Sequence, residues 1–275
     1  MKPSSSMHNH TTLCDGANTP REMADAAMAA GLSDFGFSGH SNDPTFPKSL
    51  QDEPGYIAAI NELKKEYEGR LRIYCGIESD YLYPTKSRDN LDFIVGSVHN
   101  IPVKGPEMGF CIDNNQEIID DAINRYYDGD GVAMARDFYE CTVDNAIKNK
   151  PDIFGHFDII LKLNADNRYF DESSKRYMDL ARAAAAECAR VGGVFEINTG
   201  GVYKSYRDFF YPKRFLLEYL CELGAHVCID TDSHAVESIS FGMSRAISEM
   251  KAVGFRSVAI YENGGFVEKD INLYE

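Results

Sequence analysis

The sequence predicts a parallel α/β fold, and a barrel in preference to an open sheet. Short apolar segments alternate with longer amphipathic ones along almost the whole chain, which is the pattern of strands joined by crossover helices. About seven or eight strands are expected, and that number favours a barrel, although an open sheet would show the same alternation. No glycine-rich phosphate-binding pattern follows the first strand, so a dinucleotide-binding sheet is disfavoured.

Capping residues and apolar runs place the elements in order. Thr19 and Pro20 predict the start of a first helix that runs to Ala30, and Gly31 predicts its end. Gly224 predicts the end of a later helix in the same way. The further predicted helices are residues 56–67, 116–127, 132–149, 173–191, 212–223 and 239–253. The predicted strands after the first are residues 35–38, 71–77, 93–98, 153–155, 194–197, 226–229 and 257–261.

The segment 101–150 departs from this alternation. It predicts a loop followed by two helices, with no strand between them. Insertions at the mouth of a barrel often carry or cover an active site. We therefore predict one domain over residues 1–275, with a helical insertion at 101–150 that is placed to cover the mouth of the site.

Composition narrows the class of protein. Hydrophobic residues make up 44% of the 275 residues, which is enough for a large core. The net charge of -15 argues against general nucleic-acid binding, because phosphates would be repelled. No apolar run is long enough to cross a membrane, and residues 1–6 lack the apolar stretch of a secretion signal. The seven scattered cysteines form no C-x-x-C pair, which predicts reduced thiols and a cytoplasmic protein.

His8 and His10 lie one residue apart near the start of the chain. On an extended segment both imidazoles point to the same side, because strand side chains alternate between two faces. Such a pair alone is more often exposed than bound to a metal. Here, however, further candidate ligands lie at or just past the carboxyl ends of predicted strands, which converge on one face of a parallel barrel. The residues in this position are His8, His10, His40, Glu78, His99, His156, Asp232 and His234.

The types of ligand indicate the chemistry. Of the seven histidines only His226 falls outside the pattern, at a strand start on the opposite face, and we assign it a structural role. Six imidazoles with carboxylates and no cysteine suit zinc, manganese or iron, and they are too many for one ion. The sequence therefore predicts two or three divalent ions. Ions about 3.5–4 Å apart can clamp both oxygens of a displacement at phosphorus, which predicts a phosphoesterase with a small phosphorylated substrate.

These motifs resemble the polymerase-and-histidinol-phosphatase (PHP) family of metal-dependent phosphoesterases, in that family's order and across nearly the whole chain. The chain length, Asp15 after the histidine pair and the segment 196–199 are most similar to the stand-alone histidinol-phosphate phosphatases. The segments that carry the resemblance are 8–10 (HNH), 36–40 (GFSGH), 76–78 (GIE), 96–99 (GSVH), 155–158 (GHFD) and 232–234 (DSH).

The resemblance implies a distorted (β/α)7 barrel of the TIM type with a trinuclear metal centre. It also implies hydrolysis of L-histidinol phosphate, in histidine biosynthesis, by a hydroxide that bridges two ions. Asp232, His234 and His40 are the implied catalytic residues, with Asp232 or a metal-bound water handling protons. The implied ligand groups are His8, His10, Glu78 and Asp232 for the first ion; Glu78, His99 and His156 for the second; and Asp15, His40 and His234 for the third.

The chain departs from the family pattern at two places. The segment 3–7 before the histidine pair is polar, where the family has an apolar strand. The family's phosphate-binding arginines have no clean match near the motifs at His156 and Asn198. We expect Lys204 and Arg207 to contact phosphate instead, although solvated loop charges would look the same in the sequence.

Three functions therefore remain open at this point. The first is a histidinol-phosphate phosphatase. The second is a PHP phosphoesterase that acts on nucleotides, oligonucleotides or phosphotyrosine protein, and the missing arginines favour it. The third is a non-catalytic domain that metals merely stabilise, and the intact set of ligands counts against it.

Overall fold

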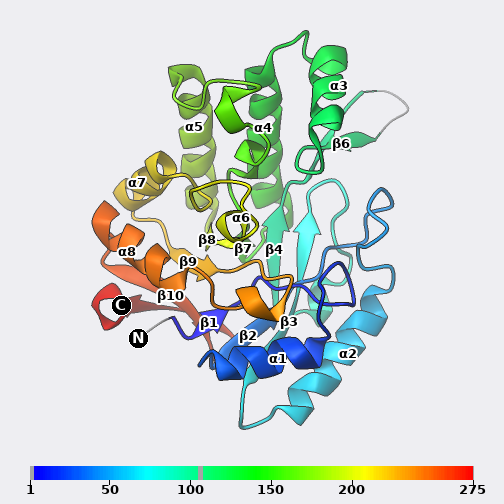
Figure 1. The fold of residues 1–275 in the computed structure, drawn as a ribbon, viewed down its shortest axis with the longest axis vertical. Coiled ribbons are helices and arrows are strands. Elements are labelled where there is room, and N and C mark those ends of the chain that lie inside the picture. Colours follow the sequence, from blue (N-terminus) through cyan, green and yellow to red (C-terminus); the bar gives the residue numbers. More distant parts are fainter. Residues whose placement is uncertain (1–2, 105–107, 275) are drawn as a thin grey trace.

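The computed structural model describes residues 3–104 and 108–274 (Figure 1). Met1, Lys2, residues 105–107 and Glu275 lie outside the described residues. The predicted polar start at 1–6 and the predicted loop after Ile101 are therefore described only in part.

Seven parallel strands form the sheet at the centre of the molecule, in the order β1-β2-β3-β4-β7-β8-β9. The sheet curls into a nearly closed barrel, because Asn9 and Ser233, just past β1 and β9, form a further parallel bridge. His10 N–H donates to the Ser233 carbonyl at 2.8 Å there. The barrel is thus confirmed over the open sheet. The strands are β1 (Ser5–Ser6), β2 (Asp34–Phe37), β3 (Arg72–Asp80), β4 (Phe93–Ser97), β7 (Ile153–Phe154), β8 (Val194–Asn198) and β9 (Val227–Asp230).

Helices follow most of the strands, and local sequence sets their ends. Thr19 and Glu22 form a capping box at the start of α1, and Gly224 ends α7 in the left-handed conformation with φ 67°, both as predicted. The connection from β3 to β4 holds only a 3-10 turn, Arg88–Asn90, which makes the barrel irregular. The main helices are α1 (Pro20–Ala29), α2 (Glu53–Glu66), α4 (Gly131–Asn149), α5 (Lys175–Val191), α7 (Arg214–Leu223) and α8 (Met243–Val253), and α6 (Gly200–Tyr203) is a single turn.

The segment after β4 is organised differently from the prediction. It begins with an antiparallel hairpin of β5 (Asn100–Pro102) and β6 (Gly109–Cys111), followed by α3 (Gln116–Tyr126). The next helix, α4, packs on β4 and α5 and serves as the ordinary crossover from β4 to β7. The part that departs from the strand–helix alternation is therefore shorter than the predicted 101–150. Figure 1 shows β6 and α3 at one end of α4, away from α1 and α2.

The last predicted strand does not join the barrel sheet. β10 (Ser257–Glu262) pairs antiparallel with β11 (Gly265–Asp270), a strand that the sequence analysis missed. This hairpin lies beside β1 and β9, where the Tyr261 N–H donates to Ser5 Oγ at 3.2 Å and the Tyr261 ring packs on Tyr74 and Phe93. Ser5 and Ser6 are both buried, and Ser6 Oγ lies 3.3 Å from Thr231 Oγ1. Hydrogen bonds to neighbouring strands thus allow the polar segment 3–7 to form the first barrel strand.

The barrel interior changes from apolar to polar along each strand. Residues two apart share a face, so Tyr74, Gly76 and Glu78 of β3 point the same way, as do Val194 and Glu196 of β8. The apolar members come from several strands and meet in one buried cluster, so the amino-terminal half of the barrel is filled. The polar members are left at the carboxyl ends, where the cavity described below opens.

Candidate active site

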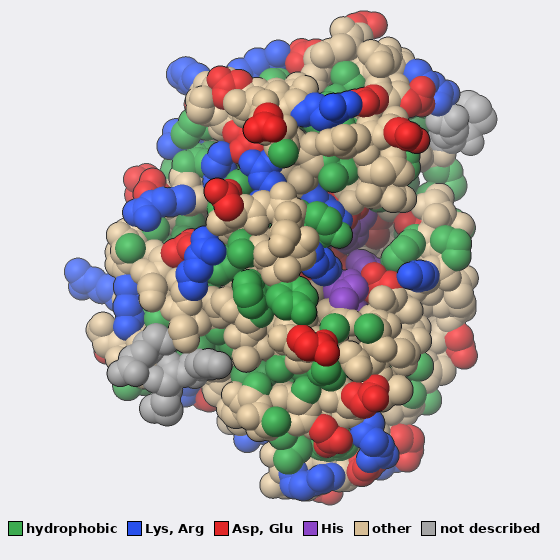
Figure 2. Space-filling view, in the orientation of Figure 1, with side chains coloured by type: hydrophobic (Ala, Val, Ile, Leu, Met, Phe, Trp, Pro, Cys, Tyr) green, Lys and Arg blue, Asp and Glu red, His purple; other side chains and the backbone are tan. Residues whose placement is uncertain are grey.

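The predicted ligands surround one cavity of about 430 Å³ at the carboxyl ends of the barrel strands. Figure 2 shows histidine side chains at the bottom of a hollow in the surface, with acidic and basic side chains beside them. His8 and His10 lie beneath the cavity and are completely buried. The structure therefore brings together side chains that lie up to 226 positions apart, as between His8 and His234.

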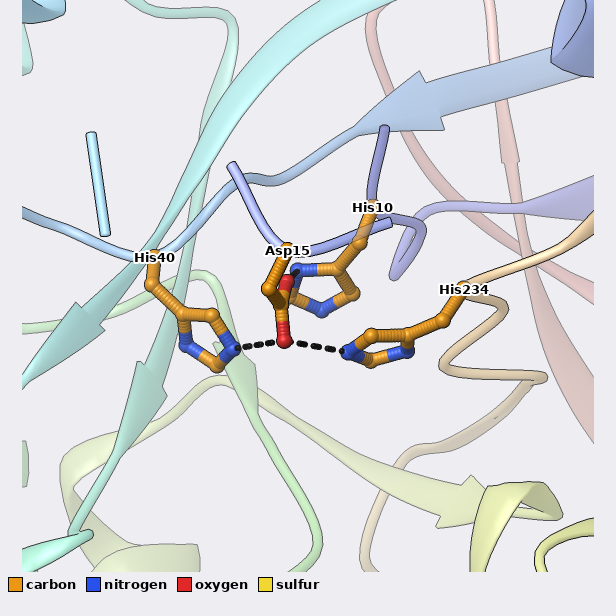
Figure 3. A group of neighbouring side chains, drawn as sticks. All are labelled: His10, Asp15, His40 and His234. Carbon is orange, nitrogen blue, oxygen red and sulfur yellow. Dashed lines mark hydrogen bonds and ion pairs between the residues drawn. The ribbon is translucent and has the colours of Figure 1, made fainter. Parts of the chain in front are cut away.

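Asp15 is at the centre of the first group, which Figure 3 shows. Its Oδ2 atom lies 3.0 Å from His234 Nε2 and 3.6 Å from His40 Nε2. Its Oδ1 atom lies 3.3 Å from His10 Nδ1. The loop after β1 therefore turns a carboxylate toward imidazoles from two other loops. This is the group that the resemblance implies for the third ion, with His10 added.

Glu78, at the carboxyl end of β3, contacts imidazoles with both of its oxygens. Oε1 lies 2.8 Å from His156 Nε2 and 2.9 Å from His99 Nε2. Oε2 lies 2.9 Å from His40 Nδ1 and 3.2 Å from His8 Nε2. A carboxylate in this position can bridge two ions, which is the role that the resemblance implies for it.

Asp232 lies opposite Glu78, in the loop after β9. Its Oδ1 atom lies 3.3 Å from both His10 Nε2 and His234 Nδ1, and 3.9 Å from His8 Nε2. Its backbone adopts a left-handed conformation with φ 46°, which an Asp tolerates better than most residues. This turn aims the carboxylate back into the cavity.

The donor set fits divalent ions. The groups with ligand atoms within 4.8 Å of one another overlap, and together they hold every predicted ligand. His8 Nε2, His10 Nε2 and Glu78 Oε2 are buried and lie close to one another, but none makes a hydrogen bond of good geometry with a described residue. Buried polar atoms normally make such a bond. A cation shared by these three atoms would satisfy them, so the clusters are able to hold metal ions.

Glu78 and His234 are held in the charge states that bind metals, whereas nearby carboxylates raise the pKa values of His8, His10, His40 and His99 against the effect of burial, so a cation would displace protons from those imidazoles. Burial alone would raise the pKa of Glu78, but His8, His40 and His99 together hold it well below its usual value, so the carboxylate stays ionised. Burial, together with His10, lowers the pKa of His234 to about 4, so its imidazole stays neutral. An ionised carboxylate and a neutral imidazole are the forms that bind metals.

Glu196, on β8, accepts hydrogen bonds from two of the candidate ligands, His8 and His156. Its Oε1 atom accepts a hydrogen bond from His8 Nδ1 at 2.7 Å, and Oε2 accepts one from the backbone N–H of His156 at 2.6 Å. Asn198 Nδ2 donates to the same Oε2 at 3.1 Å. A carboxylate behind a ligating histidine fixes its ring orientation and tautomer. Glu196 lies in a segment that resembles the family, but its role could not be predicted from the sequence, because the contact depends on how β8 faces β1.

The predicted phosphate contacts differ in their placement. Lys204 lines the cavity, with Nζ 3.1 Å from His234 Nδ1 and 4.0 Å from Asp232 Oδ1. Arg207 is not among the lining residues, and its guanidinium instead binds Glu172 at 2.8 and 3.0 Å and the Leu161 carbonyl. The structure therefore brings Lys204, but not Arg207, to the site.

The segment after β6 contributes a residue that the sequence analysis missed. Asp113 lines the cavity, with Oδ1 3.4 Å from His99 Nδ1 and Oδ2 3.0 Å from Lys162 Nζ. Burial alone would raise the pKa of Asp113, but Lys162 and His99 hold it well below its usual value. Asp113 and Lys162 thus form an ionised pair in the cavity wall. No local motif marks Asp113, because its partners lie in other loops.

His226 lies at the opposite end of the barrel, as predicted. It is exposed, and Nδ1 lies 2.7 Å from Glu268 Oε1 of β11.

Among the described residues, the helices are all too short or too polar to traverse a lipid bilayer.

The fold and the convergent histidines and carboxylates define a metal-binding barrel, and comparison with known proteins identifies its family. The model of the PHP domain matches residues 6–200, more than half of the chain, so the chain belongs to the PHP family.

Several proteins that are similar to this chain are named as histidinol-phosphatases. The chain is 29% identical to a probable histidinol-phosphatase of Deinococcus radiodurans, over 91% of its own length and 94% of that protein. It is 26% identical to a probable histidinol-phosphatase of Schizosaccharomyces pombe, over 98% and 94%. Its fold is similar to the Lactococcus lactis histidinol phosphate phosphatase solved with zinc, L-histidinol and phosphate, with a TM-score of 0.70, 22% identity and coverage of 96% and 99%. A putative histidinol phosphatase of Listeria monocytogenes has a TM-score of 0.74 at 23% identity, over 88% and 99%.

Proposed function

We propose that this chain is a metal-dependent phosphomonoesterase that hydrolyses L-histidinol phosphate to L-histidinol and inorganic phosphate, in histidine biosynthesis. The observation that carries the proposal is one cavity of about 430 Å³ that is lined by seven of the nine candidate metal ligands, with His8 and His10 buried beneath it. That volume suits a small ester and lies in the ordinary range for ligand pockets. The activity named for the relatives supports the choice of substrate.

Divalent ions in this cavity would supply Lewis acidity, which activates water and stabilises negative charge on the phosphoryl oxygens. Zinc is the first candidate, since the Lactococcus lactis structure contains it, and manganese and iron also suit the donors. The proposed ligand groups are those of the family resemblance, with Glu78 shared between two of them. Glu196 would keep His8 in the tautomer that presents Nε2 to the cavity.

Lys204 and Lys162 are the proposed contacts for the phosphate. Both line the cavity, and an ammonium group can donate to phosphoryl oxygens from several directions. Asp113 raises the pKa of Lys162 despite its burial, so this side chain stays charged. Arg207 would act at a distance, because its ion pair with Glu172 and its bond to the Leu161 carbonyl brace the loops that carry Lys204 and Lys162.

Proton transfer is the remaining requirement of the reaction. Water adds to phosphorus, the ester P–O bond breaks, and the leaving alcohol oxygen gains a proton. Asp232 lines the cavity, and we propose that its carboxylate takes a proton from the water and returns one to the alcohol. His234 Nδ1 lies 3.3 Å from Asp232 Oδ1, and the His40 ring lies 6.3 Å from the His234 ring; we propose that both histidines orient the reacting groups as well as bind metal.

We further propose that residues 1–275 act as one PHP domain and that the chain works in the reducing cytoplasm. The continuous seven-stranded sheet supports the first statement, and the second is supported by all seven cysteines being free.

The test is a hydrolysis assay on the purified, metal-loaded protein with L-histidinol phosphate, other phosphomonoesters and a single-stranded oligonucleotide. We expect a clear preference for L-histidinol phosphate and no nucleotide release. His99→Ala should lower kcat at least about 100-fold, since a metal ligand is lost, whereas His226→Ala at the far end should not change it. Equal rates on all monoesters, or release of nucleotides with the monoesters untouched, would overturn the proposal.

A further inference from the structure

Asp113 differs from the other acidic residues in the cavity wall. Asp43 and Asp80 also line the cavity, but their oxygens accept hydrogen bonds from the protein itself, including Asn100 Nδ2 to Asp43 at 2.9 Å and the His99 N–H to Asp80 at 2.8 Å. Asp113 accepts no backbone hydrogen bond among the described residues. Its Oδ1 atom accepts from the Cys111 thiol at 3.2 Å and lies 3.4 Å from His99 Nδ1, and its shortest contact is the Lys162 ammonium, 3.0 Å from Oδ2. Its charge is therefore balanced chiefly by a flexible side chain.

Lys162, like Asp113, has few contacts with the rest of the protein. Its Nζ atom lies 3.0 Å from Asp113 Oδ2 and 4.6 Å from the centre of the Tyr206 ring, and no other described residue binds it. The side chains of Lys162 and Asp113 are 16% and 14% exposed, so each charge is largely removed from water. An ion pair in this setting is costly to break by removing one partner, but either partner can be replaced by a ligand group of the same charge.

Such a pair is complementary to a zwitterion. A ligand that carries both a phosphate and an ammonium group can exchange partners with it, so that Lys162 turns to the phosphate and Asp113 receives the ammonium. No buried charge is left unpaired by this exchange, whereas a plain phosphate ester that draws Lys162 away would leave Asp113 without a cation. This part of the cavity wall therefore favours phosphate esters that also carry an ammonium group.

The position of Asp113 indicates the spacing between the ammonium group and the phosphate in a suitable ligand. Its Oδ1 atom lies 3.4 Å from Nδ1 of His99, whose Nε2 faces Glu78, and Asp113 itself lines the cavity, so the carboxylate lies one imidazole ring away from the metal-binding atoms that would hold the phosphate. In an ester whose ammonium group is on the carbon next to the ester-bearing carbon, the ammonium lies close enough to the phosphate to reach the Asp113 carboxylate. L-Histidinol phosphate has this spacing.

We infer that Asp113 is the residue that selects for the amine, binding the ammonium group of a short 2-aminoalkyl phosphate while Lys162 binds its phosphate. The inference rests on the proposed function and deepens it, since it makes the amine, rather than the imidazole alone, a basis of selection.

The test compares L-histidinol phosphate with its deaminated analogue, 3-(imidazol-4-yl)propyl phosphate, on the metal-loaded protein. The wild-type protein should prefer the amine-bearing ester by at least about tenfold in kcat/KM, because a buried carboxylate is paired only in that complex. Asp113→Asn should lower kcat/KM for L-histidinol phosphate about 30- to 100-fold and change it less than about threefold for the analogue. Lys162→Gln should lower both values alike, since both esters carry the phosphate.

Asp43→Asn is the matched control, because it removes a carboxylate from the same wall whose oxygens are already bound; it should affect the two esters equally. Metal content, measured for every variant, separates loss of ions from loss of selection. Equal losses on both esters in Asp113→Asn would overturn the inference and leave Asp113 as a support for His99. A wild-type protein that hydrolyses both esters without preferring the amine would overturn it even if the variant does not fold. A wild-type protein that hydrolyses neither would overturn the proposed function, and the inference with it.

Discussion

Glu196 shows how much of the site depends on one carboxylate that does not face the substrate. It is completely buried, and it connects the first barrel strand to the loop after β7 through His8 and the backbone of His156. A histidine can offer either ring nitrogen to a metal, and the hydrogen bond at the other nitrogen decides which. In this chain Glu196 accepts from Nδ1, which leaves Nε2 of His8 free for the cavity.

Glu196→Gln should therefore weaken metal binding about 10- to 100-fold, because an amide is a poorer acceptor for the His8 Nδ1–H and no longer carries the charge that favours a bound cation. The measurements are metal content after dialysis and the metal concentration that gives half-maximal activity. Glu268→Gln is the control, since Glu268 pairs with His226 far from the cavity. A variant that retains metal and activity like the control would contradict this role.

The packing of neighbouring strands depends on two glycines that leave room for an aromatic ring. Phe93 of β4 is buried inside the barrel, and its ring lies over Gly76 of β3 and Gly36 of β2. A Cβ atom on Gly76 would lie 2.4 Å from Cζ of Phe93, and one on Gly36 would lie 2.6 Å from the same atom. The absence of side chains at these positions allows one large ring to fill the barrel below Glu78.

Gly76→Ala should lower the free energy of unfolding by about 1–3 kcal/mol, because Phe93 must leave its position in a closely packed interior. Urea unfolding at a fixed excess of metal measures this change. Gly265→Ala is the matched control, since an added Cβ there meets no atom within 4 Å. Equal midpoints for the two variants would show that the ring moves at no cost.

At the scale of the whole molecule, the barrel places several ionisable groups in one interior. Glu78, His8, His10 and His156 are buried at its carboxyl end, in a chain whose net charge is -15. Bringing them together without a cation leaves close polar contacts without a hydrogen bond of good geometry, as between His8 Nε2 and Glu78 Oε2. Bound ions should therefore contribute to the stability of the fold as well as to its chemistry.

Removal of the metals with a chelator should lower the melting temperature. An ion present at a thousand times its Kd stabilises the folded state by about 4 kcal/mol, which corresponds to roughly 8–16 °C for a chain of this size. Thermal unfolding followed by circular dichroism, before and after chelation, measures the shift. Adding zinc or manganese back should restore it. An unchanged melting temperature in protein shown to be free of metal would contradict a stabilising role.

Much of the fold and most of the candidate site could be predicted because the signals are local. Strand and helix periods, the Thr19 cap and the Gly224 stop are properties of short segments, and the predicted bounds lie within a few residues of most elements. Eight of the nine candidate ligands were found because each follows a strand, and parallel strands share one carboxyl end, whereas Asp15 came from the family resemblance. The hairpin β5–β6 and the strand β11 were missed because they are short and their pairing carries no such signal.

The sequence by itself determined the strand–helix alternation, the family and the residues able to bind metal, since each follows from the type and spacing of neighbouring residues. Only the tertiary structure decided the closure of the barrel, which joins Asn9 to Ser233. It also decided which charges meet: Glu196 with His8, Asp113 with Lys162, and Arg207 with Glu172 instead of the cavity. These pairings depend on the relative positions of distant loops, and the physical reason is that a charge removed from water binds the nearest opposite charge in space, wherever it lies in the chain.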